Sequence, residues 1–181
     1  MLFSSVTFLY LFLPAVLLLY AAVPGRGKNY VLLGASLLFY FCGEPSYTVL
    51  LAVSSLSDYL HSLYIEKHRG SPRAKLALIS SIVVNLGMLA FFKYTDFFLG
   101  SLNSLFGLLQ LPWQLPLLHL RLPIGISFFT FQTMSYTIDV YRGKARAQRN
   151  FATLATFVCL FPQLVAGPIV RYTDVAAQLE R

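Results

Sequence analysis

The sequence predicts an all-α protein that crosses a membrane about six times. Of its 181 residues, 57% are hydrophobic and only 12% are charged, a balance too apolar for a soluble protein. Apolar segments of 13 to 19 residues recur along the chain, separated by short polar or basic stretches. A chain of this length can form one domain, so we treat residues 1–181 as parts of a single membrane domain.

Six apolar segments account for the expected spans. They are Val6–Val23, Tyr30–Cys42, Tyr47–Ile65, Leu76–Phe92, Ile124–Tyr141 and Phe151–Val165. The first has no basic residue before it and lacks the n-region of a cleaved signal peptide, so we expect a retained span. The second and sixth are short, and Pro162 interrupts the sixth. Broken segments at membrane depth need protein or a watery cavity around their free backbone groups, which suggests a funnel or a thinned site.

Basic residues gather in alternate loops and predict the orientation. Ten of the fourteen Lys and Arg residues follow the first, third and fifth segments: Arg26, Lys28, Lys67, Arg69, Arg73, Lys75, Arg142, Lys144, Arg146 and Arg149. The positive-inside rule places these loops in the cytoplasm and the N-terminus outside. The same loops explain the net charge of +7, and no nucleic-acid-binding motif is present, so we expect no nucleic-acid partner.

The long connection between the fourth and fifth segments, residues 93–121, contains an amphipathic pattern. Apolar residues recur at helical spacing at positions 98, 102, 105, 106 and 109, and small or polar residues lie opposite. Trp113 follows between two prolines. We expect an interfacial amphipathic helix on the outer surface, anchored by its aromatic residues.

The fifth segment lies within LPIGISFFTFQTMSYTIDVYRG, residues 122–143. Pro123 is tolerated in a first helical turn, and Arg142 with Gly143 closes the helix with a basic turn and a left-handed cap. A helix over Ile124–Tyr141 is about 27 Å long, close to the thickness of the hydrocarbon core.

Polar residues lie on two faces of this helix. Gln132, Ser135, Tyr136 and Asp139 share one face, and Ser127, Thr130, Thr133 and Thr137 lie roughly opposite. Two interpretations remain open. Either this is a central helix that packs on both sides, or Gln132 and Asp139 line a cavity.

Few residues could carry catalysis. Ser54, Asp58 and His61 share one face of the third segment, but one helix rarely aligns a triad, so we expect a polar stripe that faces other helices. His61 and His119 are weak catalytic candidates, at a cytoplasmic helix end and at the outer mouth. Cys42 and Cys159 have no metal-ligand spacing, so no metal is predicted.

The stretch FPQLVAGPIVRY, residues 161–172, is the last informative one. Gly167 and Pro168 break any helix there and leave Arg171 just beyond. Arg171 could bind a phosphate, a carboxylate or a helix C-terminus, or it could extend to lipid headgroups.

These two stretches, in this order, resemble signatures of the membrane-bound O-acyltransferases, specifically the bacterial branch of alginate O-acetyltransferase and the teichoic-acid D-alanyl transfer protein. The opening MLFSSVTFLYLFLP and the stretch NYVLLGASLLFYFCGEPSY before the third segment are also similar, so the resemblance covers nearly the whole chain. Members of the family are longer, and their catalytic histidine lies in a C-terminal half. By resemblance, residues 1–181 are the N-terminal half, with no catalytic residue carried over.

The resemblance also implies a function. It places Gln132, Asp139, Tyr141, Arg142, Gly167, Pro168 and Arg171 around an acyl-transfer tunnel. It implies a bacterial inner-membrane enzyme that transfers an acetyl group from acetyl-CoA, with no bound cofactor. The acceptor would be an exopolysaccharide such as alginate or a periplasmic transferase partner, and the implied partners include membrane lipid and the missing C-terminal half.

Two other functions remain alternatives. The chain could be an inactive, truncated subunit that scaffolds a polysaccharide modification or export complex. A small transporter would explain the broken helices but not the two signature stretches.

Overall fold

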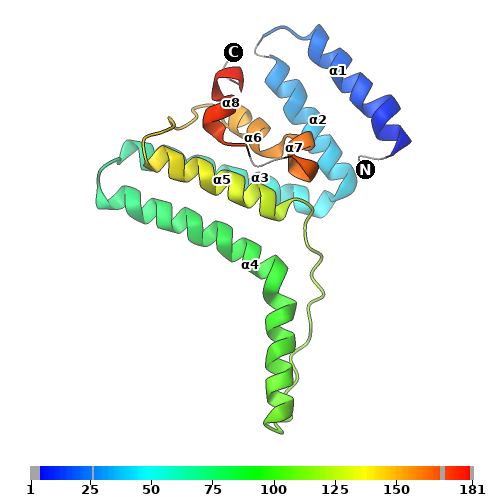
Figure 1. Cartoon of the computed structure of the whole chain (residues 1–181), viewed down its shortest axis with the longest axis vertical. Coiled ribbons are helices and arrows are strands. Elements are labelled where there is room, and N and C mark those ends of the chain that lie inside the picture. The colour runs from blue at the N-terminus through cyan, green and yellow to red at the C-terminus, as the bar shows by residue number, and fades with distance from the viewer. Residues whose placement is uncertain (1–4, 26, 168–169, 180–181) are drawn as a thin grey trace.

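The computed structural model describes residues 5–25, 27–167 and 170–179, and all regular structure within them is helical (Figure 1). In chain order the elements are the π-helix η1 (Phe8–Phe12), α1 (Leu13–Ala22), α2 (Gly27–Gly43), α3 (Pro45–Lys67), α4 (Pro72–Leu108), α5 (Ile126–Tyr141), α6 (Phe151–Cys159), α7 (Phe161–Ala166) and α8 (Tyr172–Leu179). The predicted all-α class is therefore confirmed for the described residues.

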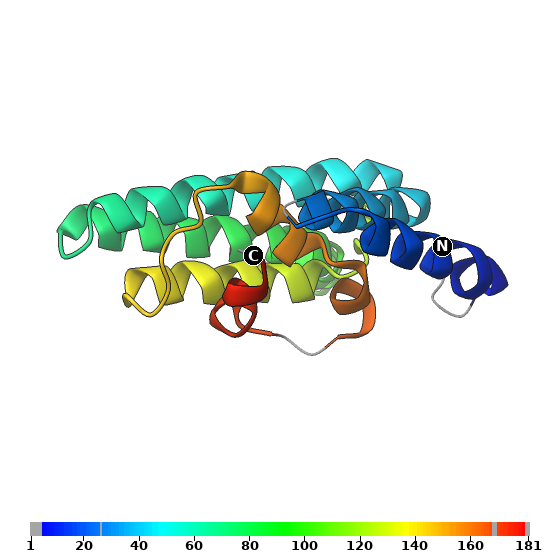
Figure 2. The ribbon, with the colours of Figure 1, turned by 90° about the horizontal axis from the view of Figure 1, so that it is seen from above.

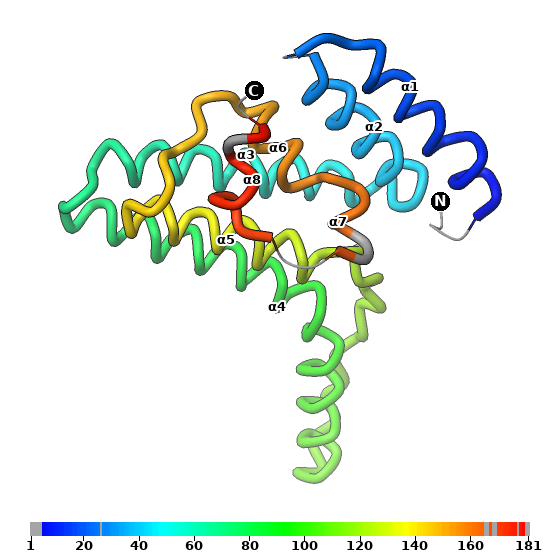
Figure 3. The backbone as a smooth tube through the Cα atoms, turned by 45° about the horizontal axis from the view of Figure 1, so that its top comes forward, coloured from blue at the N-terminus to red at the C-terminus, as the bar shows by residue number. Residues whose placement is uncertain are grey.

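Helices α3, α4 and α5 pack against one another and run side by side (Figure 2). The main core lies among them and α6, where Leu51, Phe129, Tyr136, Val140 and Leu154 are almost completely buried. Helix α8 contacts α5 and α6, so the C-terminal segment is held on this bundle beside α5 (Figure 3).

A second, aromatic core joins the beginning of the chain to α7. Phe8 and Phe12 pack against Phe39 of α2 and Phe161 of α7, with ring centroids 5.5–5.9 Å apart. Such edge-on and tilted ring contacts are favourable beyond the area they bury. The first predicted segment is thus tied to the sixth.

The outer surface of the bundle is apolar and its interior is partly polar. Large apolar side chains such as Leu18, Val53, Leu76 and Phe97 are more than half exposed. Buried polar side chains include Ser55, Asp58, Ser81 and Asn85, all at 1% exposure or less. This distribution is the reverse of that in a soluble domain.

Among the described residues, α4 has the length and hydropathy needed to cross a membrane, and the apolar helical stretch Phe8–Ala22 is shorter. The remaining crossings, and the orientation of the chain, stay predictions.

The amphipathic helix expected within residues 93–121 is not a separate element. Helix α4 continues unbroken to Leu108, because nothing in its sequence after Phe92 stops a helix. Beyond a bend in its middle part, α4 projects away from the bundle, and the connection to α5 runs back alongside it (Figure 1). Trp113, expected to be an anchor, packs edge-on against Phe106 with centroids 5.9 Å apart.

The fifth and sixth predicted segments also differ from the helices observed. Helix α5 begins at Ile126, and Pro123 lies before it, where the Pro123 carbonyl accepts from the Ile126 amide at 3.2 Å. The predicted sixth segment divides into α6 and α7 at Leu160, because Pro162 cannot continue α6 but fits the first turn of α7. The predicted left-handed cap at Gly143 is confirmed, with φ +77°.

Candidate functional site

Helix α5 is the central helix of the bundle, as the first of the two interpretations held. It contacts α3 and α4 on one side and α6 and α8 on the other. Thr130, Thr133 and Thr137 are at most 1% exposed, and Gln132 and Asp139 at most 6%. Both polar faces are therefore covered by protein, although part of one face also opens to a pocket, described below.

A buried polar network joins α3, α4 and α5. The Oδ1 atom of Asp58 accepts from the Ser81 hydroxyl and from the Asn85 amide, both at 2.8 Å. Thr133 of α5 donates to Asn85 Oδ1 at 3.4 Å. The Oδ2 atom of Asp58 has no hydrogen-bond partner. Two hydrogen bonds from α4 thus hold a carboxyl group that faces no cation at salt-bridge distance among the described residues.

A second set of contacts fixes the two signature stretches to each other. The Tyr136 hydroxyl accepts from the Gln148 backbone amide at 2.8 Å and lies 3.2 Å from the Ser62 hydroxyl. The ring of Tyr136 packs against that of Tyr172, with centroids 4.9 Å apart, and Gln148 donates to the Tyr172 hydroxyl at 2.8 Å. Tyr172 ends the second stretch and is 2% exposed, so that stretch is anchored on α5.

This anchoring creates a pocket of about 230 Å³ beside the C-terminal half of α5. Its polar residues are Ser135, Asp139 and Arg142 of the first stretch and Arg171 of the second. Phe131, Met134 and Ile138 form its apolar part. Three of the seven residues predicted to surround a tunnel therefore line one pocket.

The pocket combines two guanidinium groups with one carboxylate. Arg142 and Arg171 are exposed, Asp139 is 6% exposed, and no ion pair joins them among the described residues. Guanidinium groups bind phosphates, carboxylates and developing oxyanions through paired N–H donors. The arrangement can therefore hold an anionic or strongly polar group against an apolar wall.

The other predicted tunnel residues lie elsewhere. Gln132 points into the protein and donates to the Phe157 carbonyl at 2.9 Å, and Tyr141 packs partly buried against the main core. Gly167 ends α7, where its amide donates to the Gln163 carbonyl at 3.1 Å. Pro168 lies outside the described residues.

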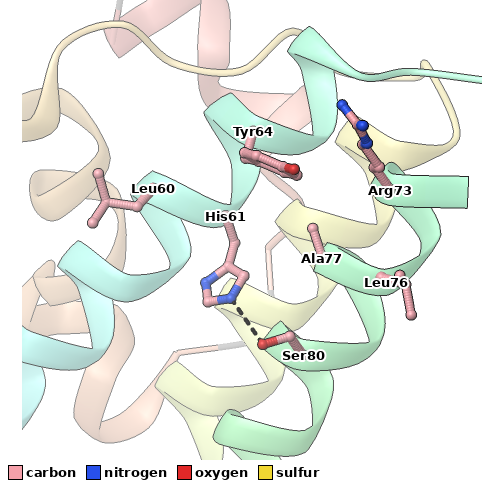
Figure 4. Close-up of a pocket in the computed structure, with 7 residues that line it drawn as sticks. All are labelled: Leu60, His61, Tyr64, Arg73, Leu76, Ala77 and Ser80. Carbon is pink, nitrogen blue, oxygen red and sulfur yellow. Dashed lines mark hydrogen bonds between the residues drawn. The ribbon is translucent and has the colours of Figure 1, made fainter. Parts of the chain in front are cut away.

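None of the three histidines lines this pocket. His61 Nδ1 donates to the Ser57 carbonyl at 2.7 Å, which leaves Nε2 to accept from the Ser80 hydroxyl at 3.3 Å (Figure 4). His68 Nδ1 bonds the Tyr64 carbonyl at 3.0 Å. His119 is exposed in the connection before α5 and has φ +48°.

The triad pattern of α3 is not assembled. Asp58 bonds to Ser81 and Asn85, whereas His61 bonds to Ser57 and Ser80. The carboxylate therefore does not orient the imidazole, and the expectation of a polar stripe facing other helices is confirmed for Asp58.

Sequence reasoning missed several polar residues that fasten α5 and the connection before it to the bundle. Ser81 and Asn85 recur four residues apart within an apolar helix, a signal that could have paired them with Asp58. Asp96 was overlooked too. Its carboxylate accepts from the backbone amides of residues 118, 119 and 120 at 2.8–3.2 Å and so ties the connection before α5 to α4.

Comparison with curated proteins gives relatives along the whole chain. A probable alginate O-acetylase AlgI of Pseudomonas aeruginosa is 42% identical over 98% of this chain and 34% of its own length. A probable alginate O-acetylase AlgI of Azotobacter vinelandii is 40% identical over 98% of this chain and 36% of its own length. A peptidoglycan O-acetyltransferase of Helicobacter pylori is 33% identical over 99% of this chain and 39% of its own length.

The chain is homologous to these O-acetyltransferases. The two signature stretches resemble those of the alginate-type O-acyltransferases, and this homology confirms the resemblance. The chain spans about a third of the length of the curated relatives it matches. No family model matches it. No solved structure matches it significantly.

Proposed function

We propose that this chain is the N-terminal part of a membrane-bound O-acyltransferase that acetylates an exopolysaccharide such as alginate. The main support for the proposal is the pocket beside α5. It is lined by Asp139 and Arg142 of one signature stretch and by Arg171 of the other. The homology to alginate and peptidoglycan O-acetyltransferases supports the same reaction class.

The pocket supplies binding groups for acetyl transfer. Attack of a sugar hydroxyl on a thioester carbonyl places negative charge on the carbonyl oxygen, and fixed cationic donors stabilise such charge. The C–S bond then breaks, and coenzyme A leaves as its thiol with the proton taken from the hydroxyl. Arg142 and Arg171 would bind the donor or this oxygen, with acetyl-CoA as the donor.

The same reaction needs a base that removes the hydroxyl proton. Histidine is the usual group at neutral pH, and no histidine lines the pocket. We therefore assign the base to a segment equivalent to the remaining two thirds of the relatives, packed against the exposed side chains of Phe128 and Phe131 on α5.

The chain would act as a multi-pass protein of the bacterial inner membrane, with its N-terminus outside. The apolar outer surface of the bundle supports membrane placement. The connection after α3 and the connection after α5 meet at one end, where the Arg69 side chain donates to the Val140 carbonyl at 2.9 Å. Two of the three basic loops therefore lie at the same end of the bundle, in agreement with the proposed orientation.

Co-expression tests the proposal. The chain is produced in a host that makes alginate but lacks its own O-acetylase, together with the remaining two thirds of an alginate O-acetylase relative. Acetyl ester on the polymer, found with the pair and absent with either part alone, is the expected result. A pair that assembles and leaves the polymer unacetylated contradicts the proposal and favours the rival function, a scaffolding subunit.

A further inference from the structure

Two adjacent pockets flank the exposed side of α3 near its C-terminal end. One, of about 460 Å³, lies between α3 and α4 and is lined by Leu60, His61, Tyr64, Arg73, Leu76, Ala77 and Ser80 (Figure 4). The other, of about 680 Å³, lies between α3 and the connection after α5 and is lined by Leu60, Leu63, Tyr64, Glu66, Lys67, Arg146 and Arg149. Because both pockets share Leu60 and Tyr64, they form one continuous surface, which we call the α3 groove.

The floor of the α3 groove is apolar and open. Leu60, Tyr64 and Leu76 are 57%, 45% and 67% exposed. The imidazole of His61 in this floor already has partners, because it bonds to Ser57 and to Ser80. The floor therefore suits a hydrocarbon chain rather than a polar ligand.

The rim of the α3 groove is cationic. Arg73 lies on the α4 side, and Lys67 and Arg146 lie on the other side of Tyr64. The one carboxylate in the lining is Glu66, which is already bonded to Arg149 at 2.7 Å and to the Ala147 amide at 2.9 Å. Within the described part of the chain, no carboxylate lies at salt-bridge distance from Arg73, Lys67 or Arg146.

We propose that the α3 groove binds an anionic phospholipid, with an acyl chain along Leu60 and Leu76 and the phosphate between Arg73, Lys67 and Arg146. Unpaired cations beside an exposed apolar strip match the two parts of such a lipid, and basic pockets at membrane surfaces bind anionic headgroups. A soluble phosphate compound would leave the apolar strip uncovered. The site rests on the proposed membrane placement but not on acetyl transfer.

Lipid binding to the purified full chain tests the site. Delipidated protein in detergent is titrated with phosphatidylglycerol or phosphatidylcholine carrying the same acyl chains, and bound lipid is measured by native mass spectrometry. We expect tighter binding of phosphatidylglycerol. Arg73→Gln with Arg146→Gln should weaken it about thirtyfold, since each surface cation contributes about fivefold.

Two controls make the result specific. Lys75→Gln removes an exposed charge two residues from Arg73 that lines neither pocket, and it should change binding less than twofold. Arg73→Lys with Arg146→Lys keeps the charge and should keep most of the affinity, which separates charge loss from misfolding.

Three results would overturn the site. They are equal affinity for the two lipids, a loss with Lys75→Gln as large as that of the double variant, and full displacement of phosphatidylglycerol by equimolar adenosine 3′,5′-bisphosphate. The last result would reassign the groove to a soluble phosphate ligand. Because no acetyl group is transferred in this assay, its failure leaves the proposed reaction to be judged by co-expression.

Discussion

The carboxyl oxygen Oδ1 of Asp58 on α3 accepts a hydrogen bond from the side-chain amide of Asn85 on α4 at 2.8 Å. Both residues are at most 1% exposed. The bond joins two helices, and its two residues are 27 positions apart in the sequence. It therefore ties α3 to α4 at a depth where an unmade hydrogen bond is expensive.

Asp58→Ala should destabilise the bundle strongly, because it leaves the Ser81 hydroxyl and the Asn85 amide without their acceptor. A loss of about 3 kcal/mol is expected from two stranded buried donors. Asp58→Asn keeps a carbonyl acceptor and removes a charge that has no cation beside it, so its unfolding temperature should stay near that of the parent. Thermal unfolding of detergent-solubilised protein measures both, and an equal loss in the two variants would show that the negative charge itself is required.

Gly125→Ala should destabilise the entry into α5. Gly125 has φ +76°, and an added Cβ would lie 2.7 Å from the carbonyl oxygen of Leu164 in α7. Left-handed backbone costs an alanine about 1 kcal/mol before this clash is counted. Gly87→Ala is the matched control, since Gly87 lies inside α4 with open space around it, and it should be neutral or stabilising by up to about 1 kcal/mol. Similar unfolding temperatures for both variants would contradict the close approach of Gly125 to Leu164.

The proposed orientation predicts which surface positions a membrane-impermeant thiol reagent reaches. In a background without Cys42 and Cys159, cysteines at Arg73 and Arg146 should react only after the cytoplasmic face is opened. A cysteine at Ser104, on the projecting part of α4, should react in intact cells. Labelling of position 73 in intact cells would reverse the orientation.

The sequence predicts a helix boundary best where a proline or glycine lies at the end of an apolar segment. Pro45 opens α3, Gly143 follows α5, and Pro162 divides the last apolar run, all visible in the sequence. The projecting half of α4 was missed because its amphipathic pattern resembles that of a surface helix, and no proline or cap separates it from the preceding turns. Helix α8 was not predicted, because its eight residues are too few to show a period.

The sequence points to some of the residues that line the pocket, but not to the pocket's geometry. The signature stretches pointed to Asp139, Arg142 and Arg171, and the structure places all three in one pocket. The resemblance places Gln132 near the same tunnel, and in the structure its side chain donates to the Phe157 carbonyl. Helical spacing predicts the face on which a residue lies but not the neighbour that covers it. The packing of Tyr136 on Tyr172 required the tertiary structure.

The chain alone should not transfer an acetyl group. Acyl transfer needs a proton acceptor within about 3 Å of the attacking oxygen, directly or through one water. The pocket beside α5 is lined by no histidine. Purified chain mixed with acetyl-CoA and an oligosaccharide should therefore give no ester by mass spectrometry. Transfer that His61→Ala or His119→Ala abolishes would show that one of these histidines is the base.

The central claim is that Arg142 and Arg171 bind the reacting groups, and acetyl transfer by the co-expressed pair tests it most directly. Arg171→Gln should lower the rate at least about tenfold while assembly stays normal, since a charge-assisted hydrogen bond contributes about 1.5–3 kcal/mol. Lys144→Gln, an exposed position outside the pocket, should leave the rate unchanged. An assembled Arg171→Gln pair that acetylates as fast as the Lys144→Gln pair would contradict the account.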